Sequence, residues 1–183
     1  MKVGIVPVGS VNADLMQNLA DNLSKTFPDT SFSVLKKNLP LNENAFNKTR
    51  KQYNSDTILA EVKLYVSKQK RCHRILGVVD ADIYVHDLNY VFGEAFTPGN
   101  VALISLWRLK PEFYKDKPNQ ETLQTRVVKE AIHELGHTLG LQHCYRSACV
   151  MHFSNSIFDA DKKQNVFCDE CSLQIAIAVN NIR

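Results

Sequence analysis

Three histidines and one glutamate lie close together in segment 133–144, which reads His-Glu-Leu-Gly-His-Thr-Leu-Gly-Leu-Gln-His-Cys. On a helix, His133 and His137 lie one turn apart on the same face, so their imidazoles can bind one zinc ion. Glu134 is then placed to act on a water molecule bound to that metal. Gly140 permits a sharp turn, because glycine reaches positive φ without a Cβ clash, and the turn can return His143 as a third ligand. Three protein ligands leave one position open for water, as a catalytic zinc site requires.

The extension beyond the short His-Glu-x-x-His pattern carries this prediction. The short pattern alone also occurs by chance in amphipathic helices with surface histidines, whereas the addition of Gly140 and His143 is far more specific. Gly136 supports the prediction, because a glycine in a helix interior costs about 1 kcal/mol relative to alanine. A glycine at this position indicates that another group packs close to the helix backbone.

Four cysteines follow in two close pairs, Cys144 with Cys149 and Cys168 with Cys171. Four thiolates at this spacing suit a tetrahedral zinc site, which would be structural because no coordination position stays open. The alternatives are two disulfides or four unrelated buried thiols. The chain begins without a signal peptide, which favours a reducing, cytoplasmic location and argues against disulfides. Because Cys144 follows His143 directly, ordering the cysteine site would also fix the third histidine.

Met151, two residues after Cys149, lies where a turn follows the third histidine, although it also suits an ordinary core position. The segment closely resembles the archaemetzincins, a family of metzincin-like zinc peptidases. The resemblance rests on the residues from His133 to Cys144, on Cys149-Val150-Met151 and on Cys168-Asp169-Glu170-Cys171. Segments 76–82 and 89–95 also look like that family.

The resemblance implies a role for each of these residues. Two zinc ions are expected per chain, a catalytic one at the three histidines and a structural one at the four cysteines, with Glu134 as general base and Met151 as the Met-turn residue. It implies one metzincin-like catalytic domain over residues 1–183. Its N-terminal subdomain, 1–140, would hold the sheet and active-site helix, and its C-terminal subdomain, 141–183, the third histidine, the Met-turn and the cysteine site. Some metzincins place a tyrosine where Phe153 stands here, so no phenol is available at that position.

Composition limits the classes of function. The chain has 183 residues, of which 44% are hydrophobic and 22% charged, as in one ordinary globular domain. No apolar run approaches the ~20 residues needed to span a bilayer, so no membrane partner is predicted. A net charge of +3 is too small to predict nucleic-acid binding. The basic run at 68–71 suits the solvated end of a helix instead, and no sequence pattern indicates an oligomeric state.

Strands and helices alternate along the chain, which predicts an α/β (α+β) fold of the zincin kind with a mainly parallel, twisted sheet packed on helices. Apolar runs predict five strands, at 3–8, 32–35, 74–79, 90–92 and 101–107. Helices are predicted from residue 12 or 14, from residue 56, over 121–139 (the active-site helix) and over 172–180, and 36–53 is predicted as mostly loop. The fourth strand follows the third by a short connection, so we expect it to be antiparallel and at an edge.

Three further expectations concern the surroundings of the site. The edge strand, around residues 89–94, is expected to border the cleft and to pair with the backbone of an extended peptide. Asp80 and Asp82 are expected to form a turn by bonding to the backbone rather than to bind a metal. Loop 110–120, rich in lysine and proline, is expected to flank the cleft, and the apolar final helix to be well buried.

Together these features predict a zinc-dependent metallopeptidase that hydrolyses peptide bonds with a zinc-activated water and Glu134 as general base. The alternative is a catalytically silent or latent module, stabilised by zinc, that binds peptides or regulates a partner. Glu134 argues against this alternative, because a purely structural ligand set does not need that carboxylate. A zinc enzyme acting on a non-peptide amide is a third possibility, which the expected edge strand disfavours.

Overall fold

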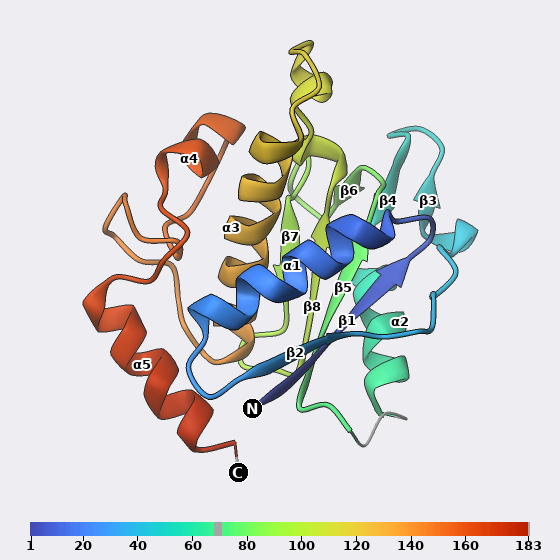
Figure 1. Cartoon of the computed structure of the whole chain (residues 1–183). Coiled ribbons are helices and arrows are strands. Elements are labelled where there is room, and N and C mark those ends of the chain that lie inside the picture. Colours follow the sequence, from blue (N-terminus) through green and yellow to red (C-terminus); the bar gives the residue numbers. More distant parts are fainter. Residues whose placement is uncertain (68–70, 183) are drawn as a thin grey trace.

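The computed structural model describes residues 1–67 and 71–182, so most of the basic run predicted as a helix end, at 68–71, lies outside the described residues. The helices and strands alternate along the chain (Figure 1). They are β1 (Lys2–Val8), α1 (Ala13–Thr26), β2 (Ser31–Val34), η1 (Glu43–Ala45), β3 (Phe46–Asn47), β4 (Gln52–Asn54), α2 (Ser55–Ser67), β5 (Arg74–Val79), β6 (Ile83–Tyr84), β7 (Gly93–Ala95), β8 (Val101–Ser105), η2 (Trp107–Leu109), η3 (Pro111–Tyr114), α3 (Gln120–Thr138), α4 (Ile157–Lys162) and α5 (Asp169–Asn180).

The central sheet has five strands in the order β2-β1-β5-β8-β7. Strands β2, β1, β5 and β8 run parallel, and β7 pairs antiparallel with β8 at the edge. In the parallel register, Leu76 of β5 lies beside Ile5 of β1 and Ala102 of β8. This topology confirms the predicted mainly parallel sheet with one antiparallel edge strand.

Helices cover both faces of the sheet, as parallel sheets require (Figure 1). On one face, α1 and α3 pack on the sheet and on the C-terminal segment in an apolar cluster that includes Leu19, Val127 and Ile175. On the opposite face, α2 packs through Leu59 and Val62. The long helix α3 therefore lies between the sheet and the C-terminal segment, in contact with both.

The edge strand lies three residues later than predicted. We expected it at 90–92, but β7 is formed by Gly93–Ala95, and its neighbour is β8 rather than β5. The apolar side chains of 90–92 serve packing instead: Phe92 is buried in the core, and its ring meets that of Tyr90 edge-on, with 5.4 Å between centroids. The run also makes single backbone bonds to neighbouring strands, from the Val91 N–H to the Ile83 carbonyl at 3.1 Å and from the Ser105 N–H to the Phe92 carbonyl at 2.8 Å, but the paired edge strand begins at Gly93.

Segment 36–53 has more structure than predicted, because it contains η1 and two short strands, β3 and β4, that form a second sheet with β6. The next helix, α2, is capped by Asn54 and not by Asp56: the Asn54 Oδ1 accepts a 2.9 Å hydrogen bond from the Thr57 N–H. Asp56 lies inside the first turn, where a carboxylate is favoured by the helix dipole.

The carboxylates of Asp80 and Asp82 bind side chains and not the backbone turn that we predicted. Asp82 forms a bidentate pair with Arg108, at 2.6 and 2.8 Å, and Asp80 pairs with Lys110 at 2.7 Å. The two pairs join the end of β5 to the 3₁₀ helices after β8. In the described part of the chain, neither aspartate belongs to a cluster able to hold a metal.

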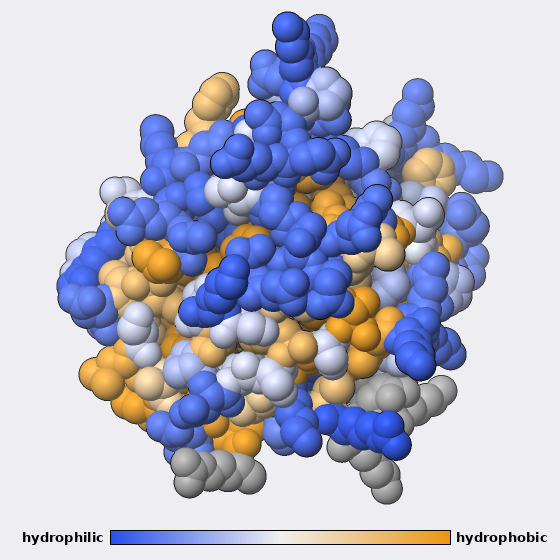
Figure 2. Space-filling view, in the orientation of Figure 1, coloured by the Kyte–Doolittle hydropathy of each residue, from blue (hydrophilic) through white to orange (hydrophobic). Residues whose placement is uncertain are grey.

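Helix α5 begins at Asp169, earlier than predicted, and buries only one of its faces. Ile175 and Val179 are in the core, whereas Leu173 and Ile177 are 64% and 53% exposed. Figure 2 shows apolar side chains at the surface in the lower left, where α5 lies in Figure 1. The expectation of a well-buried final helix was therefore wrong for this face. Among the described residues, no helix combines the length and apolar character needed to cross a bilayer.

Candidate active site

Helix α3 places His133, Glu134 and His137 in its last turns. It begins after Asn119, whose side chain caps the helix by accepting a 2.9 Å hydrogen bond from the Thr122 N–H. The helix crosses the sheet beside β8 and β7, and both His133 and Glu134 are buried there. The site is therefore built on a rigid element packed on the edge of the sheet.

The predicted sharp turn is present at the end of α3. Gly140 has a φ of +96°, its N–H donates to the His137 carbonyl at 2.9 Å, and the Leu141 N–H donates to the Gly136 carbonyl at 3.1 Å. These two bonds form a Schellman motif, which ends a helix and reverses the chain. The reversal brings His143 back beside the two helical histidines.

One ring nitrogen from each histidine lies within 4.8 Å of the other two. The Nε2 atoms of His133 and His137 are 3.1 Å apart, and the Nδ1 atoms face the carbonyls of Val150 and Leu141 at 2.9 and 2.7 Å. A carbonyl only accepts hydrogen bonds, so in these two rings Nδ1 bears the hydrogen and Nε2 presents a lone pair. Burial lowers the pKa of all three imidazoles, which keeps them neutral. Three neutral imidazoles converging in this way fit a zinc ion.

Met151 is the group that packs against Gly136. Met151 is fully buried, and a Cβ atom at Gly136 would lie only 2.5 Å from its Sδ. The glycine is therefore required by a close approach of the methionine to the helix, as the sequence indicated. Met151 occupies the core next to the last turn of α3, beside the helical histidines.

Glu134 is enclosed by the backbone of β7 on one side. A Cβ atom at Gly93 would lie 2.6 Å from Cγ and 3.0 Å from Oε1 of Glu134, so only glycine leaves room for this carboxylate. Burial raises the pKa of Glu134 well above its usual value, and the nearby charge of Glu130 adds to the effect. Glu130, one turn earlier on α3, is itself buried with a raised pKa. Sequence reasoning missed Gly93, and its only indication of Glu130 would have been the one-turn spacing to Glu134.

A cleft of about 480 Å³ opens over these side chains. Residues 88–95 line one wall, residues 153–155 line another, and the three histidines, Glu130, Glu134 and Lys163 also contribute. The Phe153 ring packs on His143 at 4.9 Å, and the Tyr90 hydroxyl donates a 2.9 Å bond to the Asn155 carbonyl, joining the two walls. The segment around the edge strand thus borders the cleft, as predicted. Loop 110–120 contributes no lining residue, contrary to our expectation.

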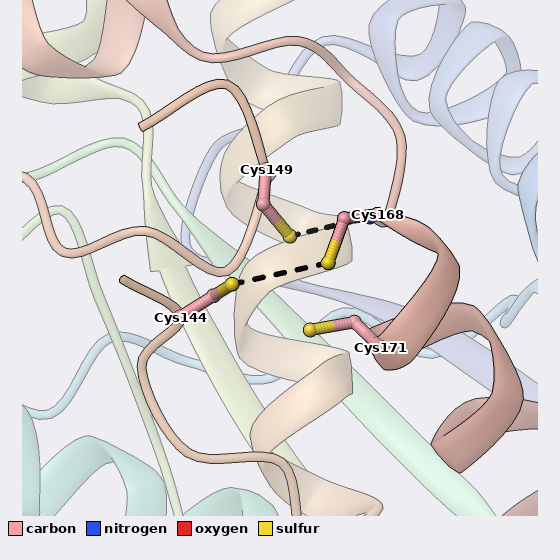
Figure 3. A group of neighbouring side chains, drawn as sticks. All are labelled: Cys144, Cys149, Cys168 and Cys171. Atoms are coloured by element: carbon pink, nitrogen blue, oxygen red, sulfur yellow. Dashed lines mark hydrogen bonds between the residues drawn. The ribbon is translucent and has the colours of Figure 1, made fainter. Parts of the chain in front are cut away.

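The four cysteines form a second cluster, shown in Figure 3, with all Sγ atoms within 4.8 Å of one another. Cys144 and Cys149 come from the loop after α3, and Cys168 and Cys171 from the start of α5. The Sγ atoms of Cys144 and Cys168 are 3.9 Å apart, and the Cys168 N–H donates to the Cys149 Sγ at 3.4 Å. All are free thiols, which excludes the two-disulfide alternative in this structure. Four convergent sulfurs fit a closed tetrahedral zinc site.

The cluster favours a thiolate at Cys168. Burial opposes the charged form, but hydrogen bonds from the Cys171 backbone and from the neighbouring thiols lower the pKa of Cys168 to about 7. Cys171, by contrast, has a raised pKa, because it is buried and lies beside Cys168. The pocket therefore favours the thiolate, the form of cysteine that binds a metal, at Cys168 and disfavours it at Cys144 and Cys171.

Segment 144–152 connects the two clusters, because it carries two of the cysteines and contacts one of the histidines. The Cys144 N–H donates to the Met151 carbonyl at 2.9 Å, and the Cys144 carbonyl faces the His152 Nδ1 at 2.8 Å. Between them, the Val150 carbonyl orients His133. The loop that carries two of the four cysteines thus also supplies the hydrogen bond that fixes one histidine of the other cluster.

With this geometry the chain is a zinc-dependent metallopeptidase of mixed α/β fold, and comparison with known proteins agrees. A sequence profile of peptidase family M54 matches residues 5–176. The archaemetzincin of Methanocaldococcus jannaschii is 43% identical over 171 residues, covering 93% of this chain and 90% of the relative. That of Saccharolobus solfataricus is 39% identical over 176 residues, covering 96% and 93%. The chain therefore belongs to peptidase family M54, the archaemetzincins.

Solved structures show the same fold. The crystal structure of archaemetzincin from Archaeoglobus fulgidus, complexed with malonate, has a TM-score of 0.80 at 39% identity and covers 95% of this chain and 99% of that one. The archaemetzincin of Methanopyrus kandleri has a TM-score of 0.85 at 32% identity, with coverages of 98% and 96%. The predicted family, fold and enzyme class are thereby confirmed.

Proposed function

We propose that this metallopeptidase holds its catalytic zinc at His133, His137 and His143 and uses Glu134 as the general base. One observation carries the proposal: three imidazole nitrogens converge beside a buried carboxylate, in a cleft bordered by the edge of a sheet. The silent or regulatory module is the less favoured alternative, because it gives no reason for enclosing a carboxylate beside the histidines.

Each side chain has a defined task in the proposed reaction. A zinc ion bound at the histidines would polarise the scissile carbonyl and acidify the attacking water. The Glu134 carboxylate removes a proton from that water and later delivers it to the leaving amine. The glycine backbone of β7 limits the positions that the Glu134 carboxylate can adopt, which orients Oε1. Phe153 brings no donor into the cleft, so it supplies packing against His143 and no proton.

We infer that the substrate is an extended peptide lying along β7. This strand is the last of the sheet, and the segment around it lines the cleft. A strand at a sheet edge offers backbone N–H and C=O groups to a further strand. The peptide backbone would then be held by main-chain hydrogen bonds, and its scissile bond would lie over the histidines.

The remaining assignments concern the rest of the chain. We propose a second, structural zinc at the four cysteines, Met151 as the Met-turn residue, and one catalytic domain with subdomains 1–140 and 141–183. Support comes from the convergence of the sulfurs and the packing of Met151 against Gly136. We also propose a cytoplasmic location, because a reducing compartment keeps the four thiols available for metal.

The decisive experiment compares wild type with Glu134→Ala, measuring zinc content and cleavage of a random peptide library. We expect the variant to keep its zinc, because all ligands remain, and to lose about 10²- to 10⁴-fold in activity, the usual contribution of a general base. Glu121→Ala, at an exposed position in the first turn of the same helix, is the matched control. Undiminished cleavage by Glu134→Ala would remove Glu134 from the mechanism, and zinc binding without cleavage by wild type would favour the silent module.

A further inference from the structure

Lys163 is a charged residue of the cleft that the proposed reaction does not use. It follows directly after α4, is only 2% exposed, and lines the cleft together with Glu130 and Glu134. Lysine is among the residues that are least often fully buried, and it is buried almost only when its charge is paired. Its position in the cleft therefore calls for a partner.

The protein itself satisfies the Lys163 ammonium only in part. Nζ donates one hydrogen bond, at 3.1 Å, to the His152 carbonyl. The charges of Glu130 and Glu134 act on Lys163, but neither carboxylate forms an ion pair with it in the described part of the chain. An ammonium has three donors. Two donors are thus left for a group that enters from the cleft.

The rest of the cleft does not offer another cation for such a group. Lys163 is the only lysine or arginine among its described lining residues, and the walls at 90–92 and 153–155 are uncharged. Glu94 also lines the cleft, but its carboxylate accepts a 2.5 Å hydrogen bond from the Ser55 hydroxyl at the start of α2. Glu130 and Glu134 also line the cleft, so the Lys163 ammonium lies close to carboxylates of the protein itself. A negative group that enters the cleft would be drawn to this ammonium and to the histidines proposed to hold zinc.

We propose that Lys163 makes the cleft selective for peptides with a carboxylate close to the scissile bond. The carboxylate would accept the two remaining Nζ hydrogen bonds, in a charge-assisted pair shielded from water. It can come from an aspartate or glutamate side chain or from the C-terminus of a short peptide, since both present the same group. This proposal rests on the peptidase function proposed above.

A purely structural role for Lys163 makes a different prediction, and Lys129 allows the two to be told apart. Lys129 is also a buried lysine, 7% exposed, whose Nζ donates to the carbonyls of Ala160 and Asp161 at 3.0 and 2.9 Å. It does not line the cleft. If lysines of this kind only tie segments together, then replacing either one lowers stability and leaves the choice of substrate unchanged.

The test uses zinc-loaded wild type, Lys163→Met and Lys129→Met. Peptide pairs that differ only in glutamate or glutamine beside the scissile bond, all with amidated C-termini, are compared by kcat/KM. A second set pairs free and amidated C-termini on neutral peptides. We expect wild type and Lys129→Met to prefer the carboxylate about 10- to 100-fold in at least one set, as for a hydrogen-bonded charge pair, and Lys163→Met to lose that preference. The set that shows the preference identifies its source.

A binding measurement accompanies the kinetics. Calorimetry measures the affinity of the glutamate and glutamine peptides for zinc-loaded Glu134→Ala. The glutamate peptide should bind more tightly to this variant, and the difference should vanish in the double variant Glu134→Ala/Lys163→Met. Equal kcat/KM within both sets for wild type, with neutral peptides cleaved, would refute the role of Lys163 while leaving the peptidase function intact. Absence of all cleavage would refute that function, and the binding comparison would still decide on Lys163. If Lys163→Met fails to fold, equal kcat/KM within both sets for wild type would still refute the proposal.

Discussion

Gly136 shows that a residue without a side chain can determine the geometry of a metal site. It lies on α3 between two of the histidines, and the space that its side chain would fill is taken by the thioether of Met151. Alanine is the better helix former by about 1 kcal/mol. The packing of Met151 must therefore be worth more than the helix propensity that this position gives up.

Gly136→Ala should consequently destabilise the protein despite its helix propensity. The new methyl group would lie 2.5 Å from Sδ of a fully buried methionine, and overpacking of this kind costs about 1–3 kcal/mol. We expect a net loss of about 1 kcal/mol in urea unfolding, together with weaker zinc binding as Met151 shifts. Thr125→Ala, at an exposed position of the same helix, is the control and should be neutral or slightly stabilising. Equal stability of the two variants would show that Met151 moves aside without cost.

The final helix has one structural face and one exposed face. Its buried face holds Ile175 in the core, and its first turn carries Cys171 of the sulfur cluster. Residues 175–179 of this helix are all apolar, so hydrophobicity alone could not show which side faces the solvent. The burial of Ile175 and the exposure of Ile177 follow only from how the helix docks on the rest of the domain.

Ile175 and Ile177 form a matched pair for testing this docking. They are the same residue type on the same helix, but Ile175 is 1% exposed and Ile177 is 53% exposed. Ile175→Ala should lower the free energy of unfolding by about 2–5 kcal/mol through lost burial and a cavity. Ile177→Ala should change it by no more than about 0.5 kcal/mol. A similar cost for both variants, measured by denaturant unfolding, would mean that the exposed face is covered in solution.

The positions of strands were predicted correctly where the local sequence determines them. They were misplaced where contacts with distant segments determine them. Strand β5 was predicted correctly because its burial on both faces leaves a continuous apolar run. The edge strand was placed at 90–92 because Tyr90 and Phe92 look like strand residues. In the fold, the side chains of Tyr90 and Phe92 pack against each other, and the strand that pairs with β8 is formed by the next three residues, Gly93–Ala95.

The residues of the site also fall into those that local sequence patterns predict and those that only the tertiary fold brings together. The histidines follow from helical spacing and a glycine turn, both of which are local properties. Gly93 and Lys163 come from distant segments, and only the tertiary fold brings them to the cleft. No spacing rule connects Lys163 to Glu134. The sequence alone therefore predicted the metal-binding motifs but not the side chains that would select a substrate.

The molecule as a whole joins its two clusters through the C-terminal segment. Arg126 of α3 forms a bidentate pair with Asp161 at 2.8 and 2.7 Å, and Lys129 donates to carbonyls near it. At the other end of this segment, the sulfur cluster brings the loop after α3 together with the start of α5. The Val150 carbonyl, which orients His133, lies between these anchors.

Loss of the sulfur cluster should therefore weaken the histidine site, although the two share no ligand. In Cys168→Ser we expect loss of one bound zinc and a large drop in melting temperature, because structural zinc contributes directly to folding. We further expect the affinity of the histidine site for zinc to fall about 10- to 100-fold, the usual effect of disturbing a group that orients a ligand. Chelator competition measures this affinity. Cys72→Ser is the control, since Cys72 lies beside Gly4 and Leu35, apart from the sulfur cluster. Wild-type affinity at the histidine site of Cys168→Ser would show that α3 and the turn at Gly140 hold the three imidazoles without help from the cysteines.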